Sequence, residues 1–196
     1  MGIRVSVPPK GIYHAYPTLV AVVTAKLGDR MNVMSAAWHT ALSFEPFLYG
    51  VAIAPSRFTH HMIEESGEFT INFLSFQDAH YITLFGRTSG RDIDKFKVYR
   101  VEIREPVKVQ APVLAVAYAA YECKVVQAVT TGDHTFFVGE VLAAHEREDG
   151  FDEKGLPILK VLDPALYLGR NRYLSIREAV PIKMDLEEAR KKIESR

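Results

Sequence analysis

Apolar residues are grouped along this chain in short runs rich in β-branched and aromatic side chains. Gly, Pro or Asp bounds the runs, which is the pattern of β-strands separated by turns. We expect strands over residues 19–24, 48–54, 69–74, 116–129 and 136–144. Helical patterns are fewer, and we expect helices over residues 58–66, 77–85 and 185–194, the first two ended by Gly67 and Gly86. Strands and helices do not alternate, so the pattern favours a mainly β (α+β) fold, a β-barrel with appended short helices.

The composition excludes several classes of protein. The 196 residues contain 24 basic and 24 acidic side chains, so no net positive field attracts nucleic acid or an anionic membrane surface. The single cysteine, Cys123, cannot form an intramolecular disulfide, and we expect it in the core of a protein from a reducing compartment. No apolar run approaches the roughly 20 residues that span a bilayer, and residues 1–10 lack the apolar core of a signal peptide. We therefore expect a cytoplasmic protein that binds neither nucleic acid nor membrane.

The common short motifs of cofactor and metal sites are missing from the sequence. No GxGxxG follows a strand, and there is no GxxxxGK[ST], GxSxG or HExxH. The dinucleotide-binding, P-loop, hydrolase and zinc-protease interpretations are therefore excluded. We expect no metal site, and any chemistry must come from other groups of residues.

One such group lies where a strand gives way to a helix. Ser56, Arg57 and Thr59 stand at the expected helix start, where unpaired N–H groups and the helix dipole favour an anion. Two hydroxyls and a guanidinium there could hold a phosphate monoester. The alternative is that Ser56 or Thr59 caps the helix and Arg57 is solvated. Neighbouring helix positions do not share a face, so we expect His60 and His61 at the surface rather than on a metal.

A second group is a strand of small side chains flanked by polar residues. Asn32, Ser35, Ala36 and Ala37 would let a flat heteroaromatic ring approach the backbone, with Asn32 and Ser35 adding hydrogen bonds. Trp38 follows at once and is the only tryptophan. The alternative is an ordinary barrel strand with small inward residues and Trp38 as an anchor in the core.

A third candidate is a histidine in a hairpin turn. Residues 131–134 read Thr-Gly-Asp-His between two expected strands, which places His134 at the rim of the barrel. Turn chemistry alone explains the Gly and the Asp. An imidazole held by two long strands could instead act on a ligand as a donor or an acid.

Taken in order, these segments resemble the flavin reductase-like family, which includes NAD(P)H:flavin oxidoreductases and flavoredoxins. The resemblance spans about residues 12–173 and leaves an N-terminal extension over 1–11 and a tail with a helix over 174–196. It rests on seven segments: VAVVT at 20–24, NVMSAAW at 32–38, SFEP at 43–46, SRFT at 56–59, IEESGEFTIN at 63–72, TGDHTFFVGEV at 131–141 and LYLGRNRY at 166–173.

The resemblance implies an FMN-binding split β-barrel with FMN at the interface of a homodimer. It assigns the residues of the site as follows: Ser56, Arg57 and Thr59 to the phosphate, Asn32, Ser35, Ala36 and Ala37 to the flavin beside Trp38, Asn72 to a supporting position nearby, and His134 to the reactive side. It also implies that the loop over residues 87–92 could cover the flavin.

The function implied is an NAD(P)H-dependent flavin reductase that passes electrons to free flavin, a metal complex or a redox partner protein. Three alternatives stay open. One is a flavoredoxin-like FMN carrier reduced by another protein, the second is a flavin-binding dimer without turnover, and the third is a relative of pyridoxamine-phosphate oxidases. The sequence does not choose between NADH and NADPH.

Overall fold

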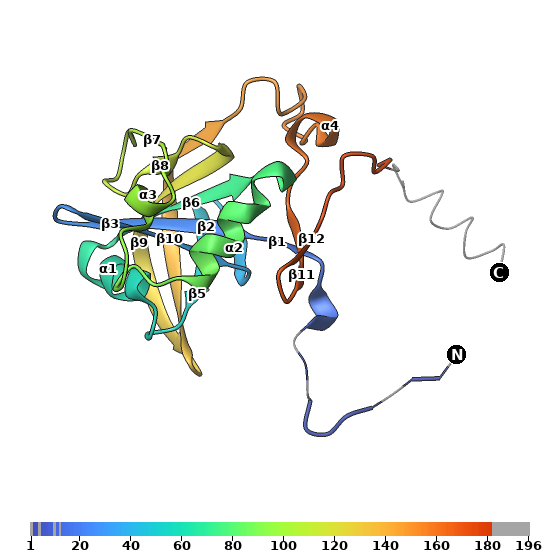
Figure 1. The fold of residues 1–196 in the computed structure, drawn as a ribbon, viewed down its shortest axis with the longest axis horizontal. Coiled ribbons are helices and arrows are strands. Elements are labelled where there is room, and N and C mark those ends of the chain that lie inside the picture. Colours follow the sequence, from blue (N-terminus) through green and yellow to red (C-terminus); the bar gives the residue numbers. More distant parts are fainter. Residues whose placement is uncertain (1, 4, 10, 12, 182–196) are drawn as a thin grey trace.

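Seven antiparallel strands make up the main sheet of the protein, in the order β3-β2-β6-β9-β10-β5-β4 (Figure 1). The structure is a computed structural model that describes residues 2–3, 5–9, 11 and 13–181. The strands of this sheet are β2 (Ala21–Leu27), β3 (Arg30–Ala36), β4 (His39–Phe44), β5 (Phe47–Ile53), β6 (Glu68–Leu74), β9 (Ala117–Thr131) and β10 (His134–Glu146). The sheet curls into a split β-barrel with β3 and β4 as its edge strands.

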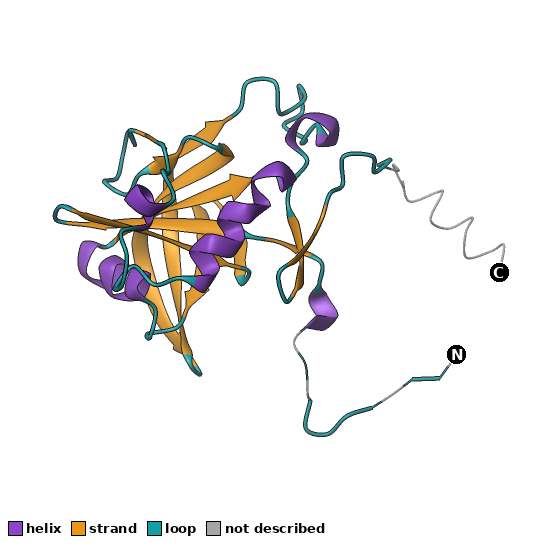
Figure 2. Cartoon of the chain, in the orientation of Figure 1, coloured by secondary structure: helices purple, strands orange, loops and turns teal. Residues whose placement is uncertain are grey.

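Smaller elements surround this barrel. The two minor sheets consist of β1 (Thr18–Leu19), β11 (Leu166–Gly169) and β12 (Arg172–Leu174), and of β7 (Ile103–Arg104) and β8 (Val113–Leu114). The helices are α1 (Phe58–Ser66), α2 (Ala79–Arg87), α3 (Lys95–Val98) and α4 (Leu159–Leu162), with 3₁₀ turns η1 (Tyr13–Ala15) and η2 (Phe76–Asp78). Figure 2 shows that strands dominate and that the helices lie outside the sheet.

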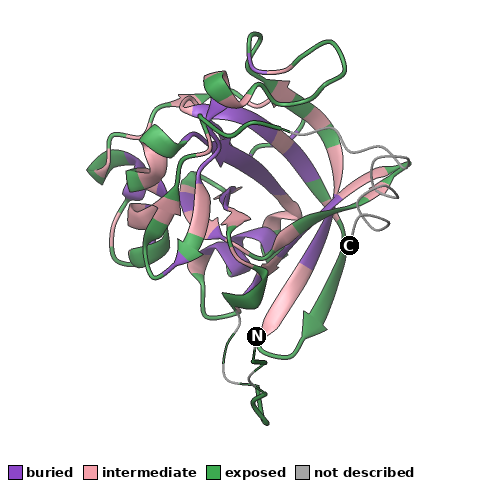
Figure 3. Cartoon of the chain, turned by 90° about the vertical axis from the view of Figure 1, so that its right-hand side faces the viewer, coloured by how far each residue is buried: buried purple, intermediate pink, exposed green. Residues whose placement is uncertain are grey.

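Strand β2 is buried on both faces, which explains its unbroken apolar run. Val23 packs into the barrel interior with Phe69, while Val22 faces a second apolar layer that contains Ile82 and Phe85 of α2. Buried positions are concentrated in the strands, and exposed ones lie mostly in the connecting loops (Figure 3). This arrangement holds α2 beside β3, the strand that carries the small residues.

The mainly β prediction is confirmed, and the expected strands occur with small shifts of their ends. The first is divided into β1 and β2. Helix α1 ends as expected, because Gly67 adopts φ 69° and its N–H donates to the Ile63 carbonyl. The prediction that Gly86 ends the second helix is wrong. This helix continues to Arg87, and the Thr88 hydroxyl donates to the Leu84 carbonyl at 2.7 Å.

Two other outcomes concern helices. The four-residue helices α3 and α4 were not expected, since one turn leaves no periodic signal. The helix expected over residues 185–194 lies outside the described residues. Within residues 13–181, no helix is long and apolar enough to cross a bilayer.

A buried carboxylate fixes the segment that crosses the end of the barrel before β8. Glu122 of β9 is fully buried and accepts hydrogen bonds from three successive backbone N–H groups, those of residues 107–109. The oxygen that accepts from Val107, Oε1, also meets His145 Nε2 of β10. Buried carboxylates need such donors, so this contact ties the segment to the sheet.

Candidate functional site

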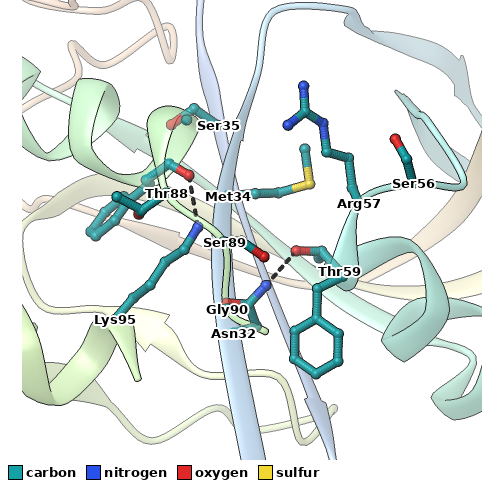
Figure 4. A pocket seen from close by; sticks show the side chains of 13 residues that line it. Asn32, Met34, Ser35, Ser56, Arg57, Thr59, Thr88, Ser89, Gly90 and Lys95 are labelled. Atoms are coloured by element: carbon teal, nitrogen blue, oxygen red, sulfur yellow. Dashed lines mark hydrogen bonds between the residues drawn. The ribbon is translucent and has the colours of Figure 1, made fainter. Parts of the chain in front are cut away.

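Five of the predicted site residues line one cavity between β3, the start of α1 and the end of α2. Its volume is about 180 Å³. We call it the α1 pocket and define it by the polar residues that border it: Asn32, Ser56, Arg57, Thr59, Ser89 and Lys95. Figure 4 shows these side chains around one space, although they come from four separate segments of the chain.

The start of α1 presents free donors to this pocket. Arg57 is the N-cap residue, with φ −78° and ψ 137°, and no side chain caps the helix. The interpretation of Ser56 or Thr59 as a simple cap is therefore wrong. Thr59 is buried, and its hydroxyl oxygen accepts a 2.8 Å hydrogen bond from Asn32 Nδ2. The Thr59 proton remains available for an acceptor in the pocket.

Two cations share the pocket. Lys95 is 3% exposed, and its ammonium donates to the Val33 and Phe85 carbonyls, both at 2.8 Å. An ammonium has three protons, so one is left for another acceptor. Burial and the nearby Arg57 charge lower the pKa of Lys95 to about 8. Within the described part of the chain, neither cation forms an ion pair with a carboxylate.

This electrostatic state favours a bound anion. Two positive groups that repel each other are stabilised when a negative ligand lies between them. Hydroxyl donors at the same place, and the N-terminal end of α1, match the oxygens of a phosphate monoester.

Lys95 was missed by the reasoning from sequence. It lies in a polar stretch, Asp-Ile-Asp-Lys, that reads as a solvated loop, and no spacing marks it as buried. Its burial follows from Phe96, the next residue, which joins the apolar layer beneath α2 and draws the backbone inward.

A second cavity, of about 250 Å³, lies beside the α1 pocket along β3. We call it the β3 cleft; it is bordered by Tyr16, Ser35, Ala36, Ala37, Trp38 and His134. Met34, Ser35 and Arg57 border both cavities, so the two lie next to each other. The Ser35 hydroxyl donates to the Ile82 carbonyl at 2.7 Å, which fixes this part of β3 against α2.

The cleft brings Trp38 and His134 together, although 96 positions separate them in the sequence. Their ring centroids are 4.8 Å apart. Trp38 is 43% exposed, so the alternative of an anchor in the core is wrong. His134 begins β10 and its Nδ1 lies 2.7 Å from Asp133 Oδ1, a contact that orients the imidazole.

Asn72 borders neither the α1 pocket nor the β3 cleft, although Val22 of β2 lies in register between it and Ser35. It is fully buried, and its side chain donates to the Val22 carbonyl at 3.1 Å and accepts from the Leu114 N–H at 2.8 Å. The register of β6 opposite β2 turns its side chain toward Leu114 of β8. Asn72 therefore supports the barrel rather than the pocket.

The expectation of surface positions is wrong for His60. It is 5% exposed, and its Nε2 lies 2.8 Å from the Thr135 hydroxyl of β10. The helix turns this residue toward the sheet, whereas its neighbour His61 is exposed. Among the described residues no three His, Cys, Asp or Glu side chains gather as a metal site requires. Cys123 is fully buried, which confirms its expected place in the core.

The comparisons with known proteins agree with this geometry. The family model described as Flavin reductase like domain matches residues 13–176. The chain belongs to the flavin reductase-like family. One relative of this flavin reductase-like protein is an uncharacterized protein of Pyrococcus abyssi, 41% identical over 145 residues, which cover 74% of this chain and 83% of the relative.

Solved structures of the family share its fold. An FMN-binding protein from Thermus thermophilus, solved with bound 1-cyclohex-2-enone, has a TM-score of 0.83 and 35% identity, with 93% of this chain and 99% of that chain covered. The flavoredoxin of Desulfovibrio vulgaris (Miyazaki F) has a TM-score of 0.81 and 26% identity, with 94% of this chain and 100% of that chain covered. The family and these neighbours indicate that flavin reductase-like chains of this kind bind flavin.

The residues of the two cavities fit FMN. Its phosphate needs anion donors, and the α1 pocket has two cations without a carboxylate partner among the described residues. Its planar ring needs an open strand with small side chains, and Ala36 and Ala37 border the cleft that begins beside Arg57. The distribution of charge therefore matches a ligand with one anionic end and one flat end.

Proposed function

We propose that this protein is an FMN-dependent oxidoreductase that uses NADH or NADPH as its reductant. The pairing of Arg57 and Lys95 in the α1 pocket, with no acidic partner among the described residues, carries the proposal because it calls for a phosphate. Bound FMN would supply the redox chemistry by accepting a hydride and giving up electrons to an acceptor. The roles of Ser56, Arg57, Thr59 and Lys95 are then to bind and orient the phosphate.

The β3 cleft has a separate role in the proposal. Ser35, Ala36 and Ala37 would hold the ring of the flavin through backbone N–H and C=O groups. Trp38 and His134 would border the open side, where a nicotinamide or an acceptor approaches. His134 is oriented by Asp133 and would act there as a positioning donor.

Reconstitution and reduction test this function. The purified chain is mixed with FMN, freed of excess by gel filtration, and its visible spectrum is recorded anaerobically before and after addition of NADH or NADPH. We expect a retained flavin spectrum that bleaches on the time scale of turnover. A chain that retains no FMN contradicts the proposal.

A flavoredoxin-like carrier is the second candidate, supported by the likeness to the Desulfovibrio flavoredoxin over nearly all of both chains. Such a carrier holds FMN but receives its electrons from a partner protein. The same experiment separates the two, because the carrier would keep its flavin oxidised with both nucleotides and would lose its colour only with dithionite.

We also propose that the protein acts as a homodimer. The β3 cleft is bordered by Trp38, which is 43% exposed, and Leu42 and Phe44 of the edge strand β4 are 44% and 98% exposed. A second copy covering these residues would complete the site. Sedimentation equilibrium is expected to give twice the 22.1 kDa mass of the chain. A monomer that binds FMN tightly contradicts this part of the proposal.

A further inference from the structure

A short segment crosses the α1 pocket at its outer end. Residues 88–91, Thr-Ser-Gly-Arg, follow α2, and we call them the strap. Thr88, Ser89 and Gly90 border the pocket together with Ser56 and Thr59 (Figure 4).

The strap is fastened to β3 at Gly90. A Cβ atom on Gly90 would lie 2.1 Å from Asn32 Oδ1, so the backbone there approaches Asn32 more closely than any other residue type allows. The Gly90 carbonyl accepts a 3.2 Å hydrogen bond from Arg30, at the start of the same strand. These contacts hold one side of the strap.

The other side is fastened at the next residue. Arg91 donates to the Ser56 carbonyl at 2.6 Å, in the segment that leads into α1. Its guanidinium carbon lies 5.6 Å from the centroid of the Phe58 ring, and that of Arg30 lies 4.7 Å from the same ring. Arg30 and Arg91, which hold the two sides of the strap, therefore both make cation–π contacts with Phe58, a residue of the first turn of α1.

The strap thus bridges the two walls of the pocket where the phosphate is proposed to end. In the proposed arrangement a flavin mononucleotide would end in its phosphate behind the strap. A flavin dinucleotide continues from this phosphate through an anhydride oxygen to a second phosphate and adenosine. That extension would have to pass the strap, which Arg91 ties to Ser56 just outside the residues that line the pocket, and this tie would have to open.

We propose that the strap makes this site selective for a flavin that ends in a monophosphate, and that Arg91 sets the selectivity. The inference rests on the proposed binding of FMN and adds which segment and which residue exclude a longer flavin. Arg91 acts by closing the pocket, since its donor is engaged with the Ser56 carbonyl. Only the longer ligand requires this contact to break, so only the affinity for the longer ligand is lowered.

Calorimetric titration of the full-length apoprotein with FMN and with FAD tests the inference. The wild-type chain is expected to bind FMN at least about tenfold more tightly than FAD, the factor that one charged hydrogen bond supplies. Arg91→Ala is expected to reduce this ratio by about tenfold. Arg91→Lys, which can still donate to Ser56 but stacks less well on Phe58, should give an intermediate ratio.

Two further variants control the result. Arg30→Ala removes the other tie and should also lower the ratio. Arg104→Ala serves as the matched control, because Arg104 likewise donates to a backbone carbonyl, that of Ala115, but borders a different cavity. The control should keep the wild-type ratio, and thermal melting verifies that each variant is folded.

Equal binding of FMN and FAD by the wild-type chain overturns the inference while leaving flavin binding intact. So does a wild-type ratio in Arg91→Ala, whatever the result for Arg30→Ala. A wild-type chain that binds neither flavin overturns the proposed function itself, and the inference with it.

Discussion

Arg57 and Lys95 are the residues on which affinity for an anionic ligand depends. Arg57 is exposed at the junction of the two cavities, whereas Lys95 is buried and tied to two carbonyls. The exposed cation can be removed with little effect on the fold. The charge of the buried Lys95 depends on pH in the range near neutrality, because its pKa is about 8.

Arg57→Ala is expected to weaken FMN binding by about 1.5 to 3 kcal/mol, nearer the lower value because solvent screens an exposed charge. Fluorescence quenching titration measures the change. Arg147→Ala is a suitable control, since this exposed arginine pairs with Asp149 far from the α1 pocket in sequence. Unchanged FMN affinity in Arg57→Ala would place the phosphate elsewhere.

Lys95 predicts how FMN affinity depends on pH. Burial, reinforced by Arg57, lowers its pKa from 10.5 to about 8, so the free protein loses this positive charge above pH 8. A bound phosphate dianion favours the charged form and raises the pKa again. Affinity should therefore fall as pH rises above 8, by at most about tenfold per pH unit. Titrations at pH 7 and 9.5 test this, and Lys95→Met should remove most of the dependence.

His134 predicts an effect on rate rather than on retention of flavin. It borders the β3 cleft but not the α1 pocket, so His134→Ala removes a positioning donor and leaves the phosphate contacts in place. Stopped-flow reduction by NADH and NADPH should slow while FMN affinity stays within a few-fold of wild type. If reduction is unaltered with both nucleotides and FMN dissociates faster, His134 holds the flavin.

Among the elements, β9 and β10 have a stabilising role that is separate from the site. Burial raises the pKa of Glu122. The hydrogen bonds that it accepts from His145 and from the backbone N–H groups of residues 107–109 lower the pKa by more, so it lies below the ordinary value of 4.5. A lowered carboxyl pKa stabilises the fold above pH 4.5, and this contribution is lost as pH falls through the lowered value.

Glu122→Gln is therefore expected to destabilise the protein at pH 7 by about 1.5 to 3 kcal/mol, the value of hydrogen bonds to a charged group. The difference from wild type should shrink as the pH falls from 4.5 through the lowered pKa of Glu122. Urea unfolding at pH 7 and at a pH below 4.5 measures this difference in free energy of unfolding, with Glu140→Gln on β10 as the control. A difference that is the same at both pH values would show that the charge of Glu122 is not responsible.

The elements also show how far sequence reasoning reaches. The apolar run of β2 and the helix ended by Gly67 were predicted because their signals are local. The same holds for the pocket residues at 56–59. Lys95 and His60 were missed or misplaced because their surroundings are set by segments distant in sequence, the layer beneath α2 and strand β10.

At the scale of the whole molecule, the barrel brings together segments that are far apart in sequence. The α1 pocket carries positive charge, and the β3 cleft beside it is bordered by small side chains. The two cavities share Arg57 and Ser35 among their bordering residues. The binding free energy of FMN should therefore have one contribution from the phosphate in the α1 pocket and another from the ring in the β3 cleft. Riboflavin carries the ring without the phosphate and isolates the second part.

The comparison of FMN with riboflavin tests the central claim most directly. Calorimetric titration of the wild-type apoprotein at pH 7 is expected to show FMN bound at least about a hundredfold more tightly than riboflavin, since two cations and a hydroxyl meet the phosphate. Equal affinity for the two ligands would contradict the account, because the α1 pocket would then contribute nothing to binding.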